Sequence, residues 1–478
     1  MLLLAAATAL GAGAAPAASY AAASVRIIPS FATTTTYSYR GTASVDLGMV
    51  VAPVGGDFEI HATRSSYDVA PVVTQVNPLD GSVVQTLGPG SLRGWRGLRR
   101  FFEITVMTKS GELAALRHLP FCPNATERVD DAAIISSRYP SLCGTQLPFV
   151  RGMVWGLEEG WASEIASIVD GAPALVKLKL PPGHYRLTVE IAEPYRSEFH
   201  VALADASDSI DLVVKDGSMR RPALASRVRA LSGRELQGIP PSPPVPTVAT
   251  ADPATLPDLV ALPPWDLEIT HWNRSRELLS FAASPWNAGP GPLVVEGVRR
   301  PGEAVMDAYQ YYYDASQTPV ARSTAGTLVY DARRGHDHWH FLQFARYELR
   351  NATGVLVRST KQSFCLAPTD AVDLTVAEAN WTPWLSAITS VCSGRSATWI
   401  REALLTGWAD TYYQTVAGQA FDVTDLPPGR YKISIVVNPL GLLQERSTAN
   451  NSAERTIYLR GHKGAHKLRV AAWHGLDG

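Results

Sequence analysis

Short runs in which apolar and polar residues alternate recur along most of the chain. Between about residues 25 and 215 they include FFEITVM (101–107), HYRLTVEIA (184–192) and SIDLVV (209–214), each bounded by Gly, Pro or Asp. A period of two places every second side chain on one face, as in a half-buried β-strand. We therefore predict an all-β N-terminal domain of the β-sandwich type over residues 25–215.

The same period continues in the C-terminal half. It predicts strands at HWHFLQFARYELR (338–350) and RYKISIVVNPL (430–440), and two strands around a Gly/Pro turn at residues 278–297. LPPGHYRLTVEI (180–191) also resembles LPPGRYKISIVV (426–437), which indicates two related β modules. Turn chemistry alone would produce the same likeness, because each stretch is a turn that leads into a strand.

A change of composition separates the two halves. Residues 217–255 begin basic and end in a proline-rich stretch that contains PPSPPVP. Such a sequence favours extended polyproline II geometry and is typical of a semi-rigid linker. We therefore place a second β domain, with long loops, at residues 256–465 and a tail at 466–478.

Charge and hydropathy limit the classes of partner. Charged residues make up 18% of the 478, and the formal net charge is −1. A nucleic-acid partner is not expected, because phosphate binding normally leaves a basic surface. No stretch approaches the length of about 20 apolar residues that a membrane helix needs. The first 22 residues, an apolar run followed by small residues, have the pattern of a signal peptide, which predicts a secreted protein.

Two further features fit a secretory protein. Asn-x-Ser/Thr sequons, which predict a glycoprotein, occur at Asn124, Asn273, Asn351, Asn380 and Asn450. The four cysteines form two neighbouring pairs in the sequence, Cys122 with Cys143 and Cys365 with Cys392. In an oxidising compartment we expect each pair to form a disulfide, although four cysteines permit three connectivities.

Three histidines at alternate positions stand out, namely His336, His338 and His340. On a strand they share one face, and imidazole is a good ligand for copper, zinc, iron and nickel. In a regular strand, however, the outer two Cα atoms would lie about 13 Å apart. Three ligands on one ion therefore require a bend or bulge here, which the adjacent Gly335 would permit.

Other interpretations of the histidines remain open at this point. A surface strand can be rich in histidine without binding a metal. A zinc site similar to that of carbonic anhydrases, which carry a His-x-His-Trp strand, would need a further histidine on a neighbouring strand. No second histidine-rich strand stands out in the sequence.

Four ordered motifs resemble the lysyl oxidase family, over about residues 256–465. HDHWHFLQFARYEL (336–349) is similar to the copper-binding stretch of that family, and KQSFCLAPT (361–369) to its Lys-x-Ser-Phe-Cys-Leu signature. The segment 407–439 resembles the family's region around Asp-Thr-Tyr. NPLGLLQERSTANNS (438–452) is similar to its closing Asn-Pro…Glu…Asn-Asn run.

The resemblance implies a copper-dependent amine oxidase. It assigns copper to His336, His338 and His340, and a lysyl tyrosylquinone cofactor to Lys361 crosslinked with Tyr412. For the crosslink the lysine amine must be neutral, a state that burial favours. The implied reaction converts a primary amine, such as peptidyl lysine, and oxygen into an aldehyde, ammonia and hydrogen peroxide. Partners would include extracellular matrix or cell-wall proteins.

The proton acceptor and the second tyrosine are less determined. Asp410, two residues before Tyr412, is a candidate general base, and Asp337 and Asp422 are alternatives. Tyr412 and Tyr413 are adjacent and should point in opposite directions, so only one can face the metal. The alignment of motifs selects Tyr412, which leaves Tyr413 as a packing residue.

One departure from the animal members of the family concerns cysteines. Animal members carry several disulfides in this domain, including a cysteine just before the first histidine, where this chain has Gly335. The pattern resembles the disulfide-poor microbial members, which puts matrix-protein specificity in doubt. The competing hypothesis from another class is a non-catalytic, secreted, metal-binding adhesion or structural β protein.

Overall fold

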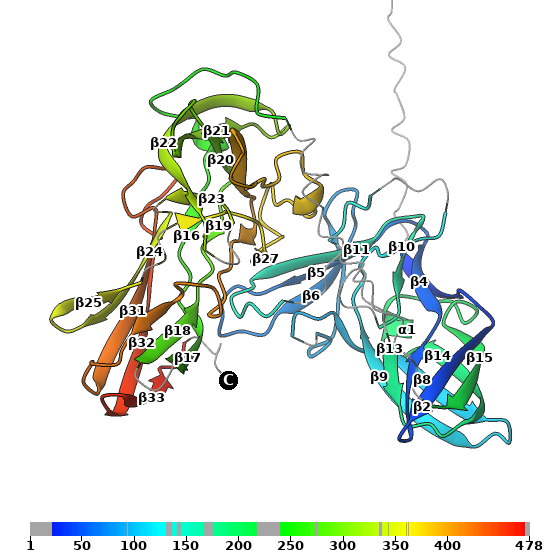
Figure 1. Cartoon of the computed structure of the whole chain (residues 1–478). Helices are drawn as coiled ribbons and strands as arrows, with labels where there is room; N and C mark the ends of the chain where they lie inside the picture. The colour runs from blue at the N-terminus through cyan, green and yellow to red at the C-terminus, as the bar shows by residue number, and fades with distance from the viewer. Residues whose placement is uncertain are drawn as a thin grey trace, which may run out of the picture.

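The computed structural model confirms an all-β fold. It describes residues 22–92, 94–130, 136–140, 145–166, 175–217, 240–272, 276–333, 337–342, 344–359, 361 and 363–473. Their strands form seven sheets, three from residues before 217 and four from residues after 240. In Figure 1 the two groups lie side by side, with β5 and β11 of the first group nearest to β27 of the second.

The N-terminal part consists of three sheets, named here in their order of strand pairing. The largest has seven strands: β13 (Leu175–Leu178), β3 (Thr42–Asp46), β2 (Thr33–Tyr39), β15 (Ser207–Asp216), β14 (Gly183–Ile191), β8 (Leu98–Thr108) and β9 (Leu113–Phe121). The second has β1 (Ser24–Pro29), β4 (Met49–Val54), β12 (Trp161–Glu164) and β10 (Glu127–Arg128). The third has β11 (Gly152–Leu157), β5 (Phe58–Thr63), β6 (Val72–Val76) and β7 (Val83–Thr86). A single helical turn, α1 (Tyr195–Glu198), follows β14.

Alternation in the sequence accounts for the strands of the largest sheet. The predicted strands at 101–107, 184–192 and 209–214 fall in β8, β14 and β15. In β14 the side chains of Leu187 and Val189 are fully buried, and the residues between and beside them are more exposed. One apolar face is therefore packed inward, as the period of two requires.

The C-terminal part consists of four sheets, again in pairing order. A six-stranded sheet has β26 (Ser363–Phe364), β23 (His338–Leu342), β22 (Pro319–Asp331), β21 (Val305–Tyr313), β20 (Leu293–Val298) and β28 (Trp399–Leu404). A five-stranded sheet has β25 (Gly354–Arg358), β24 (Ala345–Asn351), β31 (Gly429–Val437), β32 (Ser452–His462) and β33 (Ala465–Val470). A smaller, four-stranded sheet has β16 (Leu259–Val260), β19 (Trp286–Asn287), β29 (Trp408–Ala409) and β27 (Asp370–Ala371). A three-stranded sheet has β17 (Trp265–Trp272), β18 (Arg276–Ala282) and β30 (Ala420–Asp422). Short 3₁₀ turns lie at Pro253–Thr255 and Pro383–Leu385.

Two predicted strand regions are divided differently in the structure. The stretch 338–350 is split between β23 and β24, which belong to different sheets. The stretch 278–297 holds parts of three strands, β18, β19 and β20, each in its own sheet. Period-two patterning predicts a strand but not where the chain changes sheet, because both sides of such a corner bury apolar residues.

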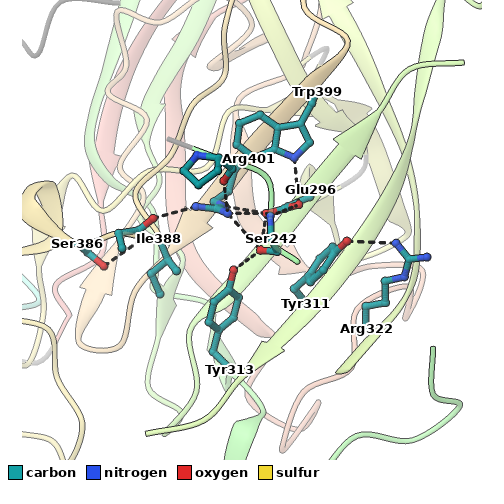
Figure 2. Close-up of polar contacts among 11 residues, drawn as sticks. Ser242, Glu296, Tyr311, Tyr313, Arg322, Ser386, Ile388, Trp399 and Arg401 are labelled. Carbon is teal, nitrogen blue, oxygen red and sulfur yellow. Dashed lines mark hydrogen bonds and ion pairs between the residues drawn. The ribbon is translucent and has the colours of Figure 1, made fainter. Parts of the chain in front are cut away.

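The end of the proline-rich segment is bound to the C-terminal part. Backbone bonds join Val248 N to Arg322 O (2.8 Å) and Arg322 N to Pro246 O (2.9 Å). Figure 2 shows Ser242 directed at the carboxylate of Glu296, to which its hydroxyl donates at 2.7 Å. Residues 240–255 therefore pack on the six-stranded sheet, although the sequence predicted them as linker.

Buried apolar side chains connect the two parts of the molecule. One contiguous cluster includes Ala23 and Phe101 from the N-terminal sheets together with Phe364 and Leu459 from the C-terminal sheets. Within the part of the chain that the structure describes, no helix is long and apolar enough to span a bilayer.

Candidate functional site

The motif residues meet where strand β23 pairs with β26. Phe341 lies opposite Phe364, so the histidine strand and the segment after Lys361 are neighbours in one sheet. Tyr412 reaches the same place from the segment that follows β29, where it forms an isolated two-way backbone bridge with Ala283, with N to O distances of 2.9 and 3.0 Å. Segments separated by about seventy residues in the sequence therefore converge.

The histidine strand begins with a bend. Asp337 has a φ of +48°, a left-handed conformation that Asp tolerates better than most residues. Directly after it, the rings of His338 and His340 lie on one face with their centroids 4.6 Å apart. His336 lies outside the described residues. A bend was predicted here, and the structure has one at Asp337; Gly335, the residue expected to permit it, lies outside the described residues.

His340 is fixed from one side of its ring. It is 1% exposed, and its Nδ1 lies 3.1 Å from Ser363 Oγ and 3.5 Å from Asp331 Oδ2. Asp331 in turn binds the guanidinium of Arg333. A partner on Nδ1 orients an imidazole so that Nε2 becomes the ligating nitrogen.

Lys361 is fully buried and lies over the Tyr412 ring. Its Nζ is 4.5 Å from the centroid of Tyr412 and 4.9 Å from that of Phe364, and it donates to Ser363 O at 2.9 Å. Burial lowers the pKa of Lys361 from 10.5 to about 8, and the carboxylate of Asp410 opposes this shift. The amine is therefore close to the neutral state at which it becomes a nucleophile.

The phenol of Tyr412 lies between a carbonyl and a carboxyl group. Its hydroxyl donates to Cys365 O at 3.1 Å, and its ring makes an edge contact with Phe364 at 4.9 Å. Asp410 is 2% exposed, and among the described residues its Oδ2 has no hydrogen-bond partner. Burial raises the pKa of Asp410, and it also raises the pKa of Tyr412, where the Asp410 carboxylate adds to the effect.

The other candidate bases and the second tyrosine lie in different surroundings. Asp337 is exposed, and Asp422 forms an ion pair with Arg276 at 2.8 Å on β30. Tyr413 packs edge-on against Trp265 with its hydroxyl 3.5 Å from Asp370 Oδ2. Of the three candidate carboxyl groups, Asp410 is the one whose charge acts on both Lys361 and Tyr412.

Sequence reasoning missed Glu402, a fully buried carboxyl group beside the site. It accepts hydrogen bonds from Phe341 N at 2.9 Å and from Leu366 N at 3.1 Å. It therefore ties the histidine strand to the segment whose Cys365 carbonyl receives the Tyr412 hydroxyl. Burial raises its pKa well above the ordinary value. A single glutamate in an apolar strand carries no motif, so only the fold reveals it.

The predicted disulfides and sequons fare differently. Cys365 and Cys392 form a disulfide, as expected, and this bond anchors the segment next to Tyr412. The partner predicted for Cys122, Cys143, lies outside the described residues, as do the proposed signal segment and Asn273. Asn124 is fully buried, with its side-chain oxygen accepting from Ser163 Oγ at 2.6 Å, so it cannot carry a glycan in this fold.

A separate cavity of about 670 Å³ opens in the N-terminal part. Its walls carry charges of both signs, including Arg99, Arg100, Glu190 and Glu198. All of its lining residues lie between Gly88 and Glu198, so it is distinct from the place where Lys361 and Tyr412 meet.

The group of residues in the C-terminal site fits a metal together with a tyrosine-derived cofactor. The imidazoles of His338 and His340 share a face, and the buried amine of Lys361, whose pKa is lowered, lies over the Tyr412 ring. The buried Asp410 carboxyl group has one oxygen without a hydrogen-bond partner among the described residues. Among the described residues no three His, Cys, Asp or Glu side chains form a metal cluster, and the third histidine is not one of them. Imidazole nitrogens suit copper, as they also suit zinc, iron and nickel.

Comparison with known proteins agrees with this arrangement. A family model described as lysyl oxidase matches residues 315–467, which include every residue of the motif-derived site. Lysyl oxidase homolog 3B of Danio rerio is 28% identical over 130 residues, which are 27% of this chain and 14% of that protein. Protein-lysine 6-oxidase of Gallus gallus is 28% identical over 130 residues, 27% of each chain.

The protein-lysine 6-oxidase of Sus scrofa is also 28% identical over 130 residues, 27% of this chain and 46% of that protein. The chain thus spans less than half the length of each of these relatives. Over residues 315–467, the chain is similar to the lysyl oxidase family.

Proposed function

We propose that this protein is a secreted, copper-dependent amine oxidase that acts on primary amines, peptidyl lysine among them. The balanced reaction converts RCH₂NH₂, O₂ and H₂O into RCHO, NH₃ and H₂O₂. The observation that carries the proposal is the contact between the buried Nζ of Lys361 and the Tyr412 ring, 4.5 Å from its centroid. Lysine amines are normally solvated, so a fully buried one over a tyrosine face requires a reason.

His336, His338 and His340 would hold the copper ion. The 4.6 Å separation of the His338 and His340 rings and the Nδ1 partner of His340 support this assignment. A crosslink between the Lys361 amine and a Tyr412 ring oxidised by O₂ would give lysyl tyrosylquinone, which would supply the carbonyl and the electron acceptor that amine oxidation needs. The Cys365–Cys392 disulfide supports an oxidising, extracellular location.

The protein's own side chains would prepare and complete this chemistry. Lys361 would contribute an amine that becomes neutral near pH 8, because burial lowers its pKa from 10.5 to about 8. Asp410 would act as the general base that removes the proton from the carbon next to the substrate nitrogen. Its buried, unpartnered Oδ2 supports that role, and burial raises the pKa of Asp410, which makes its carboxylate a stronger base.

Peptide mass spectrometry on the copper-loaded, secreted protein tests the proposal. After full reduction of disulfides, we expect the Lys361 peptide joined covalently to the Tyr412 peptide, together with release of hydrogen peroxide from a lysine-containing peptide. Lys361→Arg and Tyr412→Phe are matched controls that should lack the joined species. Both peptides free in a wild-type protein that binds copper would contradict the proposal and would favour a non-catalytic, metal-binding β protein.

A further inference from the structure

The N-terminal part contacts the loop that supports the candidate active site. Residues 145–152 lie against the loop of residues 370–381. This loop begins with strand β27, and β27 pairs with β29, the strand just before Asp410. We propose that residues 145–152 are a positioning element, which holds β27 and β29 in place and thereby fixes Asp410 and Tyr412. The catalytic roles of these two residues rest on the proposed function, whereas the mechanical coupling does not.

Backbone hydrogen bonds join the two segments directly. Arg151 N and Gly152 N donate to Val372 O at 2.6 and 3.2 Å, and Leu374 N donates to Gly152 O at 2.9 Å. Gly152 and Asp373 consequently form a parallel bridge between an N-terminal sheet and the C-terminal loop. At Gly152, the start of strand β11, the loop is therefore bound by backbone hydrogen bonds in the manner of a neighbouring parallel strand. Bonds of this kind fix the position of the loop along the strand.

Side chains also pack between the N-terminal part and this loop, at Gly152 and at Trp381. A Cβ on Gly152 would lie 2.1 Å from Asp373 Oδ1 and 2.5 Å from Thr375 Oγ1, so only glycine fits without displacing that turn. Further along the loop, Trp381 stacks on Tyr139 at 5.8 Å with an angle of 14° between the rings. His61 meets the same Trp381 edge-on at 6.3 Å.

Thr145 links the N-terminal part to the site through a short chain of hydrogen bonds. Its hydroxyl donates at 2.9 Å to Oδ1 of Asp370, which is 7% exposed and begins β27. The neighbouring Thr369 accepts from Thr411 N through its hydroxyl at 2.7 Å, and its own N donates to Ala409 O at 2.9 Å. Thr145 is thus two hydrogen-bonded steps from the backbone on either side of Asp410.

The rest of the loop is bound to the same strand. Val372 N and Asp373 N both donate to Gly407 O, at 2.9 and 3.1 Å, and Trp408 Nε1 donates to Asn380 O at 2.6 Å. The loop therefore has the N-terminal part on one side and residues 406–412 on the other. Because this loop is hydrogen-bonded on both sides, we expect a loss of support on the N-terminal side to loosen residues 406–412.

The test uses the full-length protein with Thr145→Val, which keeps the shape of the side chain and removes its hydroxyl. Thr188→Val is the matched control, because the Thr188 hydroxyl also bonds a side chain, that of Ser209, but within the N-terminal sheet. The Thr145 hydroxyl makes a second, local bond, in which it accepts from Leu147 N at 2.9 Å. We expect amide hydrogen exchange across residues 406–412 to become about tenfold faster in Thr145→Val and to stay unchanged in Thr188→Val. Thr145→Ser, which restores the hydroxyl, should restore the wild-type rate.

Crosslink yield is measured on the same samples and should fall several-fold in Thr145→Val. Equal exchange at residues 406–412 in Thr145→Val and Thr188→Val would overturn the inference. A wild-type protein that forms no Lys361–Tyr412 crosslink would refute the proposed function instead. In that case the exchange rates would still decide whether the N-terminal part positions this strand.

Discussion

Two buried charged clusters lie on opposite faces of a single strand, β28. Arg401 points to one side, where it donates to Glu296 at 2.7 and 2.9 Å, and where Trp399 and Ser242 donate to the same carboxylate (Figure 2). Glu402, the next residue, points to the other side, toward the segments that carry Lys361. Adjacent residues of a strand alternate between faces, so one strand serves both clusters.

The two clusters differ in how well their charges are compensated. In the Arg401 cluster the guanidinium also donates to Ala387 O and Pro240 O at 2.9 and 3.2 Å, so cation and carboxylate are both satisfied. In the Lys361 cluster, burial shifts the pKa values of the amine and of two carboxyl groups toward their neutral forms. Compensated pairs are typical of structural sites, and shifted, incompletely paired groups are typical of sites that do chemistry.

The largest difference between the two clusters should appear when the buried cation of each is replaced by methionine. We expect Lys361→Met to abolish the crosslink and all amine oxidation without lowering the unfolding temperature, because methionine fills the volume and removes a buried amine. Arg401→Met should lower the free energy of unfolding by about 3–5 kcal/mol, since it leaves Glu296 buried without its cation.

Thermal unfolding and crosslink mass spectrometry on both variants make this measurement. If the unfolding temperature of Lys361→Met falls as far as that of Arg401→Met, Lys361 is a structural cation, and the two clusters do not differ in role.

Asp410→Asn should give the next largest effect. We expect turnover per crosslinked site to fall by about 10²- to 10⁴-fold, since the amide cannot take up a proton. In the wild type, kcat/KM should rise with pH through the pKa of Asp410, which burial raises above the usual range, because only the carboxylate is a base. The acid limb should disappear in the variant.

Asp422→Asn is the matched control for that experiment. Asp422 forms an exposed ion pair with Arg276, and its loss should change turnover less than about twofold, in keeping with the small contribution of surface pairs. Peroxide release across a pH series gives both results. An unchanged acid limb in Asp410→Asn would assign the base to another group.

The smallest effect concerns the pH dependence of crosslink formation. Burial lowers the pKa of Lys361 to about 8, and only the neutral amine reacts. The initial rate after addition of copper should therefore rise between pH 6 and 9, and at pH 6 it should be about a hundredfold below its plateau. Copper occupancy is measured at each pH as a control, because imidazole ligands also lose metal when protonated. A midpoint above pH 10 would mean that the amine is solvated.

Much of the fold followed from the sequence because alternation reports burial directly. The strands β8, β14 and β15 lie where the pattern placed them, and the all-β class is confirmed. Alternation failed at residues 338–350, where the chain leaves one sheet for another between Leu342 and Ala345. It also could not show that residues 240–255 bind a sheet, since proline-rich segments satisfy few backbone bonds among themselves.

The candidate site was predictable only where a family motif marks it. Lys361, Tyr412 and the histidines carry such motifs, and burial of the lysine was expected from its chemistry. Glu402 and Thr145 carry no motif, because their roles depend on hydrogen bonds to backbone or to segments more than fifty residues away. Contacts of that kind exist only after the sheets have assembled.

The attachment of Ser242 to Glu296 and of Arg401 to Pro240 bears on how the protein can be shortened. A fragment that starts at residue 256, where composition changes, would strip two partners from a buried ion pair and expose the six-stranded sheet edge at Arg322. A fragment that starts before residue 240 keeps them. The safe boundary for recombinant truncation therefore lies ahead of the prolines.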